Sequence, residues 1–204
     1  SRGMERLEEL PLQRVENQLY IHYQKGGLVM YLLRDQIGEE AVNRALRRLI
    51  ADFGFKSAPY PRSLDLVAAL RAEAPADKQA LITDLFEKIT LYDVKTTSAS
   101  VTERPDGRWN VTLVVEARKL YADGQGVETE APLNETFDIG VFSAEPGKPD
   151  FKPADVLVMQ RRQVHSGTQT FRFVTATRPT YAGVDPYNKW IDRDSNDNVR
   201  AATD

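Results

Sequence analysis

The sequence predicts an α+β protein in which a short helical layer is followed by an antiparallel β-sandwich. Up to Thr90 the apolar residues recur at helical spacing, and from Leu91 onward they alternate with polar ones. Turn-forming clusters separate the alternating runs, with no helical pattern between them, which is typical of an antiparallel sandwich. We therefore expect two domains, a helical one over residues 1–90 and a β-sandwich over residues 91–204.

The first predicted helix carries an apolar run and ends at a glycine. One side of it holds Leu28, Val29, Leu32, Leu33 and Gln36. Gly38 is expected to end the helix as a left-handed cap. The polar, aromatic segment Tyr20–Gly27 precedes this run, and we expect it to lead into the helix.

Three further helices are predicted before residue 90. The second has a clear apolar stripe, made by Val42, Ala45, Leu46, Leu49, Ile50 and Phe53. Prolines keep the segment Ser57–Arg62 extended, and Ser63 is placed to cap a third helix carrying Leu66, Val67 and Leu70. A fourth, starting near Asp77, presents Leu81, Ile82, Leu85, Phe86 and Ile89. We expect the stripe of the second helix to pack against that of the fourth.

The β region is predicted from alternation and from turns. Residues 109–117 place Trp109, Val111, Leu113, Val115 and Ala117 on one face. The turn Pro105–Gly107 stands just before this run, and the turn Asp123–Gly126 follows it. Further alternating strands are expected through Phe137, Ile139 and Val141, over Val156–Val164, and over Thr168–Ala176.

Composition excludes several classes of function. A formal net charge of −3 offers no basic face for nucleic acid. The absence of cysteine excludes disulfides, thiolate nucleophiles and thiolate metal sites. The longest apolar run, Leu28–Leu33, is far shorter than the roughly 20 residues that span a bilayer.

The segment before the first predicted helix carries the motif Tyr23-x-Lys25-Gly26. It resembles the tyrosine motif of the gluzincin-type zinc aminopeptidases, where it opens a helix downstream of a His-Glu-x-x-His zinc helix. The resemblance implies that Tyr23 is the catalytic residue of this chain, a phenol that stabilises the oxyanion of the transition state. It implies structural roles for Lys25 and Gly26.

The chain holds only His22 and His165 and no His-Glu-x-x-His. The resemblance therefore implies the C-terminal part of a peptidase, which supplies Tyr23 but no metal ligand and no cofactor of its own. Zinc would belong to the intact parent, whose substrate is a peptide. The rest of the parent chain is the expected partner.

Other segments extend the resemblance along the chain. Leu32–Glu40 and Ser63–Leu66 are similar to the helical region that follows the tyrosine in the family, and Asp185–Tyr187 and Asp192–Asn198 are similar to its C-terminal end. The similarity is closest to a bacterial subgroup in which the peptidase module is fused to a permease of the ABC-transporter type. It implies a parent associated with a membrane.

Two other features invite a binding role. His22 adjoins Tyr23, but catalytic zinc takes three protein ligands, so a hydrogen-bonding role is favoured; His165 receives no role. Asp192–Asn198 begins like an EF-hand loop, yet Asp197 stands where glycine is needed and Thr203 where a bidentate Glu belongs. A cluster of Asx turns that satisfies local backbone amides is the better interpretation.

Two functions from different classes follow. The first is a C-terminal part of a zinc metallo-aminopeptidase that contributes Tyr23 and is inactive alone. The alternative is a non-catalytic β-sandwich module that binds a partner or a peptide in a transporter-associated protein. The coding sequence upstream of Ser1 separates them: intact zinc ligands support the enzyme, and degraded ones the module.

Overall fold

The computed structural model describes residues 11–12, 19–54 and 63–204, and for residues 19–25 it describes the backbone alone. The expected extended segment Ser57–Arg62 lies outside the described residues. The chain divides into two compact units, residues 1–90 with 121–129 and residues 91–120 with 130–204. No helix in the described part is long and apolar enough to cross a bilayer.

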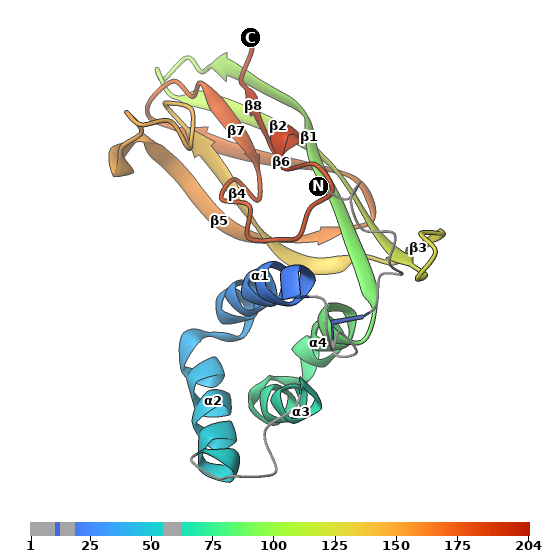
Figure 1. Ribbon diagram of the computed structural model, residues 1–204. Coiled ribbons are helices and arrows are strands. Elements are labelled where there is room, and N and C mark those ends of the chain that lie inside the picture. The colour runs from blue at the N-terminus through green and yellow to red at the C-terminus, as the bar shows by residue number, and fades with distance from the viewer. Residues whose placement is uncertain (1–10, 13–18, 55–62) are drawn as a thin grey trace. The chain divides into compact units, whose positions relative to one another are not determined.

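The first unit contains the helices, which are coloured blue to green in Figure 1. They are α1 (Leu19–Ile37), α2 (Glu39–Phe53), α3 (Ser63–Glu73) and α4 (Gln79–Phe86), the last preceded by the 3₁₀ turn Ala76–Lys78. Gly38 separates α1 from α2 with a φ of 94°, a value that L side chains rarely adopt. A glycine with positive φ does end the helix as expected, but its ψ of 149° lies outside the left-handed helical region, so the cap itself is not of the predicted type.

Helix α1 begins well before the position expected from the sequence. The segment Tyr20–Gly27 lies inside it rather than ahead of it. Gly26 and Gly27 each make a helix less favourable than alanine would, by about 1 kcal/mol. For this reason the sequence suggested that the helix begins after them. Tertiary packing outweighs this cost, because Val29, Leu32 and Leu33 are all fully buried.

Helix α2 buries only the first part of the predicted stripe, Val42 and Ala45, together with Ala41. Its buried residues are Ala41, Val42 and Ala45, all in its first half, whereas Leu46 is 36% exposed and Ile50 is 60% exposed. The main partners of α2 are α3 and α1, and α3 in turn packs against α4. The predicted pairing of α2 with α4 is therefore wrong. Apolar spacing identifies a helix face but does not identify the element that covers it.

Helices α3 and α4 bury the predicted residues. Val67 and Leu70 of α3 and Leu81, Ile82, Leu85 and Phe86 of α4 are all buried. We had expected Ile89 to lie on the fourth helix, but it is the first residue of β1. Glu73 joins α3 to α2 by accepting hydrogen bonds from Arg44 and Arg48, each at 2.8 Å.

The second unit is an antiparallel β-sandwich, so the predicted fold class is confirmed. Its strands are β1 (Ile89–Glu103), β2 (Trp109–Ala122), β3 (Glu128–Ala131), β4 (Asn134–Phe142), β5 (Val156–His165), β6 (Gly167–Thr175), β7 (Tyr181–Val184) and β8 (Val199–Ala201). One sheet has the order β1-β2-β3, with β6 also paired to β2, and the other has the order β5-β4-β7-β8. Strands β1–β3 begin or end in the helical unit.

The alternation predicted for β2 and β4 is confirmed in the core, but the one predicted over Val156–Val164 is wrong, because every residue from Met159 to Gln163 is exposed. Val111, Leu113 and Val115 of β2 are fully buried, as are Phe137, Ile139 and Val141 of β4. The β1–β2 hairpin turns at Gly107, whose φ is 81°. Gly183 of β7 is required by close packing, because a Cβ there would lie 2.1 Å from the carbonyl oxygen of Asn198.

Candidate functional site

The motif Tyr23-x-Lys25-Gly26 lies within the first two turns of α1. The expectation that it opens the helix is corrected, because α1 already begins at Leu19. Positions 23, 26, 27 and 30 follow the spacing i, i+3, i+4, i+7, which places them on one face of the helix. The buried residues Val29, Leu32 and Leu33 hold the following turns of α1 in the helical unit.

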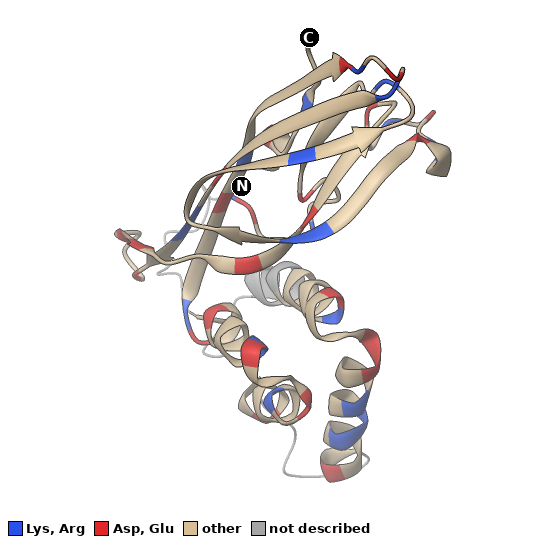
Figure 2. Ribbon diagram, turned by 180° about the vertical axis from the view of Figure 1, so that it is seen from behind, with Lys and Arg blue, Asp and Glu red and all other residues tan. Residues whose placement is uncertain are grey.

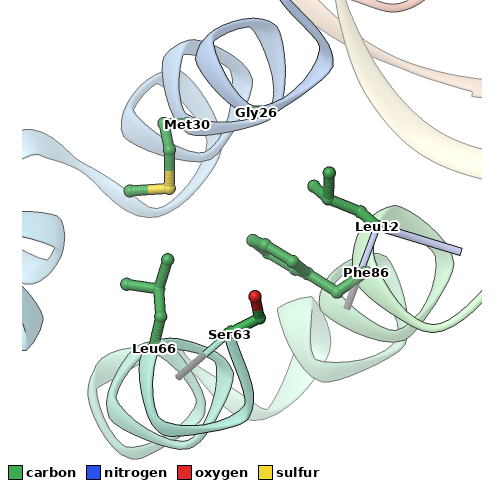
Figure 3. A pocket seen from close by; sticks show the side chains of 6 residues that line it. All are labelled: Leu12, Gly26, Met30, Ser63, Leu66 and Phe86. Atoms are coloured by element: carbon green, nitrogen blue, oxygen red, sulfur yellow. The ribbon is translucent and has the colours of Figure 1, made fainter. Parts of the chain in front are cut away.

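A small pocket lies beside the motif glycine (Figure 3). Its volume is about 90 Å³, and its lining comes from α1, α3, α4 and the N-terminal segment. The lining residues are Leu12, Gly26, Met30, Ser63, Leu66 and Phe86. The hydroxyl of Ser63 is the polar side-chain group among these apolar neighbours. The face of α1 that carries position 23 thus borders an apolar recess.

The two glycines of α1 are not required by close packing. A Cβ built at Gly26 or at Gly27 meets nothing within 4 Å. Glycine inside a helix costs about 0.5–1 kcal/mol relative to alanine. The described neighbours of α1 therefore provide no packing reason for glycine at either position.

The loop after β7 is built around the buried carboxylate of Asp185. Its Oδ1 accepts the amide of Lys189 at 3.0 Å, and its Oδ2 accepts the amide of Trp190 at 3.1 Å. Asp185 has a φ of 44°, in the left-handed region. Trp190 stacks on Phe137 with ring centroids 4.4 Å apart. These contacts fold Asp185–Tyr187 into a structural turn that anchors an aromatic side chain in the core.

Burial, with a smaller contribution from the charge of Asp138, raises the pKa of Asp185 to about 6. The amides of Trp190 and Lys189 oppose this effect, because hydrogen bonds to a carboxylate favour its charged form. Lys189 also donates to Asp138 Oδ2 at 2.8 Å. This network sits between β4 and the loop, and all of its members serve to hold the loop.

The acidic run Asp192–Asn198 forms Asx turns. The amide of Asp194 donates to Asp192 Oδ1 at 3.2 Å, and the amide of Asn196 donates to Asp194 Oδ1 at 3.0 Å. The interpretation that these carboxylates satisfy local backbone amides is confirmed. Burial raises the pKa of Asp192 to about 7, with Asp197 and Asp93 acting in the same direction.

The two histidines lie far apart in the sequence, and neither has a described metal-binding partner. His22 belongs to α1, and His165 ends β5, where its amide donates to Gln169 Oε1 at 2.6 Å. Among the side chains that the structure describes, no group of three His, Cys, Asp or Glu residues could hold a metal ion.

One buried polar cluster had no signal in the sequence. Asp84 of α4 is 4% exposed and accepts the hydroxyl of Tyr121 at 2.7 Å. The hydroxyl of Thr90 donates to the carbonyl oxygen of Asp84, also at 2.7 Å. Tyr121 is far from Asp84 along the chain, so no local pattern could have paired them. The cluster joins α4 to the strand ends inside the helical unit.

No protein-family model matches the chain, and no curated protein sequence matches it.

Proposed function

We propose that this chain is the C-terminal part of a zinc metallo-aminopeptidase and contributes Tyr23 to its active site. The observation that carries the proposal is the motif Tyr23-x-Lys25-Gly26 on α1. The packing of α1 supports it. Val29, Leu32 and Leu33 are fully buried, so the later turns of the helix that carries position 23 are packed in the helical unit. A catalytic group needs a rigid support to stay in its productive geometry.

The chemistry asked of Tyr23 is simple. When water attacks a peptide carbonyl, the carbonyl oxygen becomes an oxyanion in the tetrahedral intermediate. A neutral phenol can donate a hydrogen bond to this oxygen, and the bond strengthens as the negative charge develops. Because the benefit appears mainly in the transition state, it acts on turnover more than on substrate binding.

The resemblance implies a zinc ion, but the described residues of this chain do not fit one. They contain no cluster of ligands for it. In this proposal the ligands belong to the rest of the parent chain, which is also the partner of α1. Because the zinc ligands belong to the rest of the parent, this chain should not hydrolyse peptides by itself.

The test is Tyr23→Phe in the intact parent. The substitution removes one hydroxyl and keeps the ring, so kcat should fall by about 10² to 10³, the usual loss for one oxyanion donor. KM should change much less. Steady-state kinetics on an aminoacyl substrate measures both constants.

Tyr31→Phe is the matched control. It removes the same atom from the same helix at an exposed position, where the ring lies 5.5 Å from the guanidinium of Arg34. Its kcat should stay close to that of the parent. Normal turnover in Tyr23→Phe would contradict the proposal and leave Tyr23 as a packing residue.

The alternative, a non-catalytic module that binds a partner or a peptide, is supported by a different part of the chain. The β-sandwich has an outer strand, β5, whose residues 160–163 are polar and exposed on both faces. Degraded zinc ligands in the sequence upstream of Ser1 would favour this function over the peptidase.

A further inference from the structure

Strand β5 forms an outer edge of its sheet. The strand order is β5-β4-β7-β8, so β5 pairs with β4 on one side. In the part of the chain that the structure describes, no strand pairs with its other side. The ladder with β4 is regular from Asn134↔His165 to Val141↔Val158. An edge of this length is a template onto which another extended segment can pair.

Two hydrogen bonds show which way the backbone of β5 faces. The amide of Ser166 donates to the carbonyl oxygen of Leu133, beside β4, at 3.2 Å. The amide of the preceding residue, His165, donates instead to the side chain of Gln169. Backbone groups alternate in direction along a strand of an antiparallel pair. Residues 160, 162 and 164 therefore face β4, and residues 159, 161 and 163 face away from it.

The side chains of β5 leave this edge accessible. Arg162 and Gln160 lie opposite the core residues Phe137 and Ile139, so they occupy the core-side positions of their strand. Both are nevertheless exposed, as is every residue from Met159 to Gln163. Residues 160–163 are polar on both faces of the strand, whereas Val164 at its end is buried.

The edge is also positively charged. Arg161 and Arg162 are neighbours on β5, which contains no Asp or Glu. Figure 2 shows Lys and Arg in blue on the ribbon. Asp138 of β4 approaches Arg161 at 3.4 Å, but it also accepts Lys189 at 2.8 Å. The guanidinium of Arg162 lies 5.2 Å from the ring centroid of Phe171. Arg161 thus shares the carboxylate of Asp138 with Lys189, while Arg162 lies on the other face of β5.

We propose that the outer edge of β5, residues 159–163, binds an extended peptide segment that carries Asp or Glu side chains. The segment adds a strand to the sheet, pairing its main chain with the backbone of Met159 and Gln163. Arg161 and Arg162 point to opposite faces of β5, so carboxylates on either face of the added strand meet a guanidinium. This site is independent of Tyr23 and of the proposed peptidase function.

The probe is a blocked peptide of about ten residues in which Thr and Glu alternate, long enough to cover the edge. It is titrated into the ¹⁵N-labelled chain, and amide chemical shifts are followed by NMR. The shifts should concentrate on residues 159–163, and the amides of Met159 and Gln163 should exchange more slowly in the complex. A peptide with Lys in place of Glu should bind at least about tenfold more weakly, because it meets like charge.

Met159→Pro tests the main-chain pairing. Proline removes an amide that faces away from β4, a position where edge strands tolerate it. Met159→Ala is the matched control, since it shortens the side chain and keeps the amide. The proline variant should bind the Glu peptide about tenfold more weakly than the alanine variant. Equal affinity of the two variants would overturn the proposal.

The double variant Arg161→Gln, Arg162→Gln tests whether the two guanidinium charges contribute to peptide binding. It also provides a second test if the proline variant does not fold. It leaves Asp138 paired with Lys189, and it should also lose about tenfold in affinity. No shifts with the Glu peptide at millimolar concentration, equal binding of the Lys peptide, or shifts centred elsewhere would each refute the site. So would a dimer of the chain that Met159→Pro dissociates, because a second copy would then occupy the edge.

Discussion

At the scale of single residues, two carboxylates hold the C-terminal segment of the sandwich, the buried Asp185 and the half-buried Asp192. Asp185 uses both oxygens, one on the amide of Lys189 and one on the amide of Trp190. Asp192 accepts the amide of Asp194, and the backbone of Val94 also favours its charged form. Burial opposes the charge of both side chains and raises both pKa values. Stability should therefore depend on pH through these two groups.

The sign of that dependence follows from the pKa of Asp192, which rises from 3.8 to about 7. Between these values the folded chain keeps a proton that the unfolded chain has lost. The free energy of unfolding therefore falls as the pH rises through this window. Asp192→Asn, which carries no charge, should make the fall between about pH 4 and about pH 7 shallower. Urea unfolding at several pH values measures the slope.

The control for this prediction is Asp194→Asn. It makes the same charge change within the same acidic run, at an exposed position. It should leave most of the slope in place. An unchanged slope in Asp192→Asn would show that Asp192 does not cause the pH dependence.

At the scale of elements, helix α2 shows how a correct period can lead to a wrong partner. The apolar stripe does mark an amphipathic helix, but its buried residues are confined to the first half. The small residues Ala41 and Ala45 make the contact, and the larger Leu46 and Ile50 remain exposed. Helix α3 packs against both α2 and α4 and takes the place expected for a direct α2–α4 contact.

This packing gives a matched pair of substitutions. Leu85→Ala removes a side chain that is 3% exposed and should cost about 2–5 kcal/mol of unfolding free energy, since it leaves a cavity. Leu46→Ala, at 36% exposure, should cost less than about 1 kcal/mol, because little apolar area is lost and alanine favours the helix. Chemical denaturation followed by circular dichroism compares them. Equal costs would show that α2 is buried as the sequence had suggested.

At the scale of the whole molecule, the chain consists of a helical unit and a β-sandwich unit. The helical unit carries position 23 on α1, and the β unit carries the charged edge of β5. The two proposed activities thus belong to different units and can be tested one at a time. A variant in one unit leaves the residues of the other unchanged.

The chain by itself should bind no stoichiometric zinc and should release no product from aminoacyl substrates. The sequence holds two histidines and no His-Glu-x-x-His, and catalytic zinc sites use three protein ligands. Equilibrium dialysis with metal analysis checks the first expectation, and a chromogenic aminopeptidase assay checks the second. Tight zinc binding, or hydrolysis that persists with a chelator, would reveal an active site that the sequence does not indicate.

Several features follow from the sequence alone because they depend on neighbours along the chain. The α+β class, the helix end at Gly38, the turn at Gly107 and the buried faces of β2 and β4 all come from local period and turn chemistry. The Asx turns of Asp192–Asn198 are local for the same reason. The motif at Tyr23 is likewise visible in the sequence, and it is the basis of the proposed function.

Tertiary structure decided what depends on partners distant in the chain. Helix α1 includes Gly26 and Gly27 because burial of its later turns outweighs their low propensity. Asp84 is paired with Tyr121, which is distant in the chain. The main helical partner of α2 is α3 and not α4. Local pattern shows which face of an element is apolar. Only the packed chain shows what covers that face, and which edge, such as that of β5, stays uncovered.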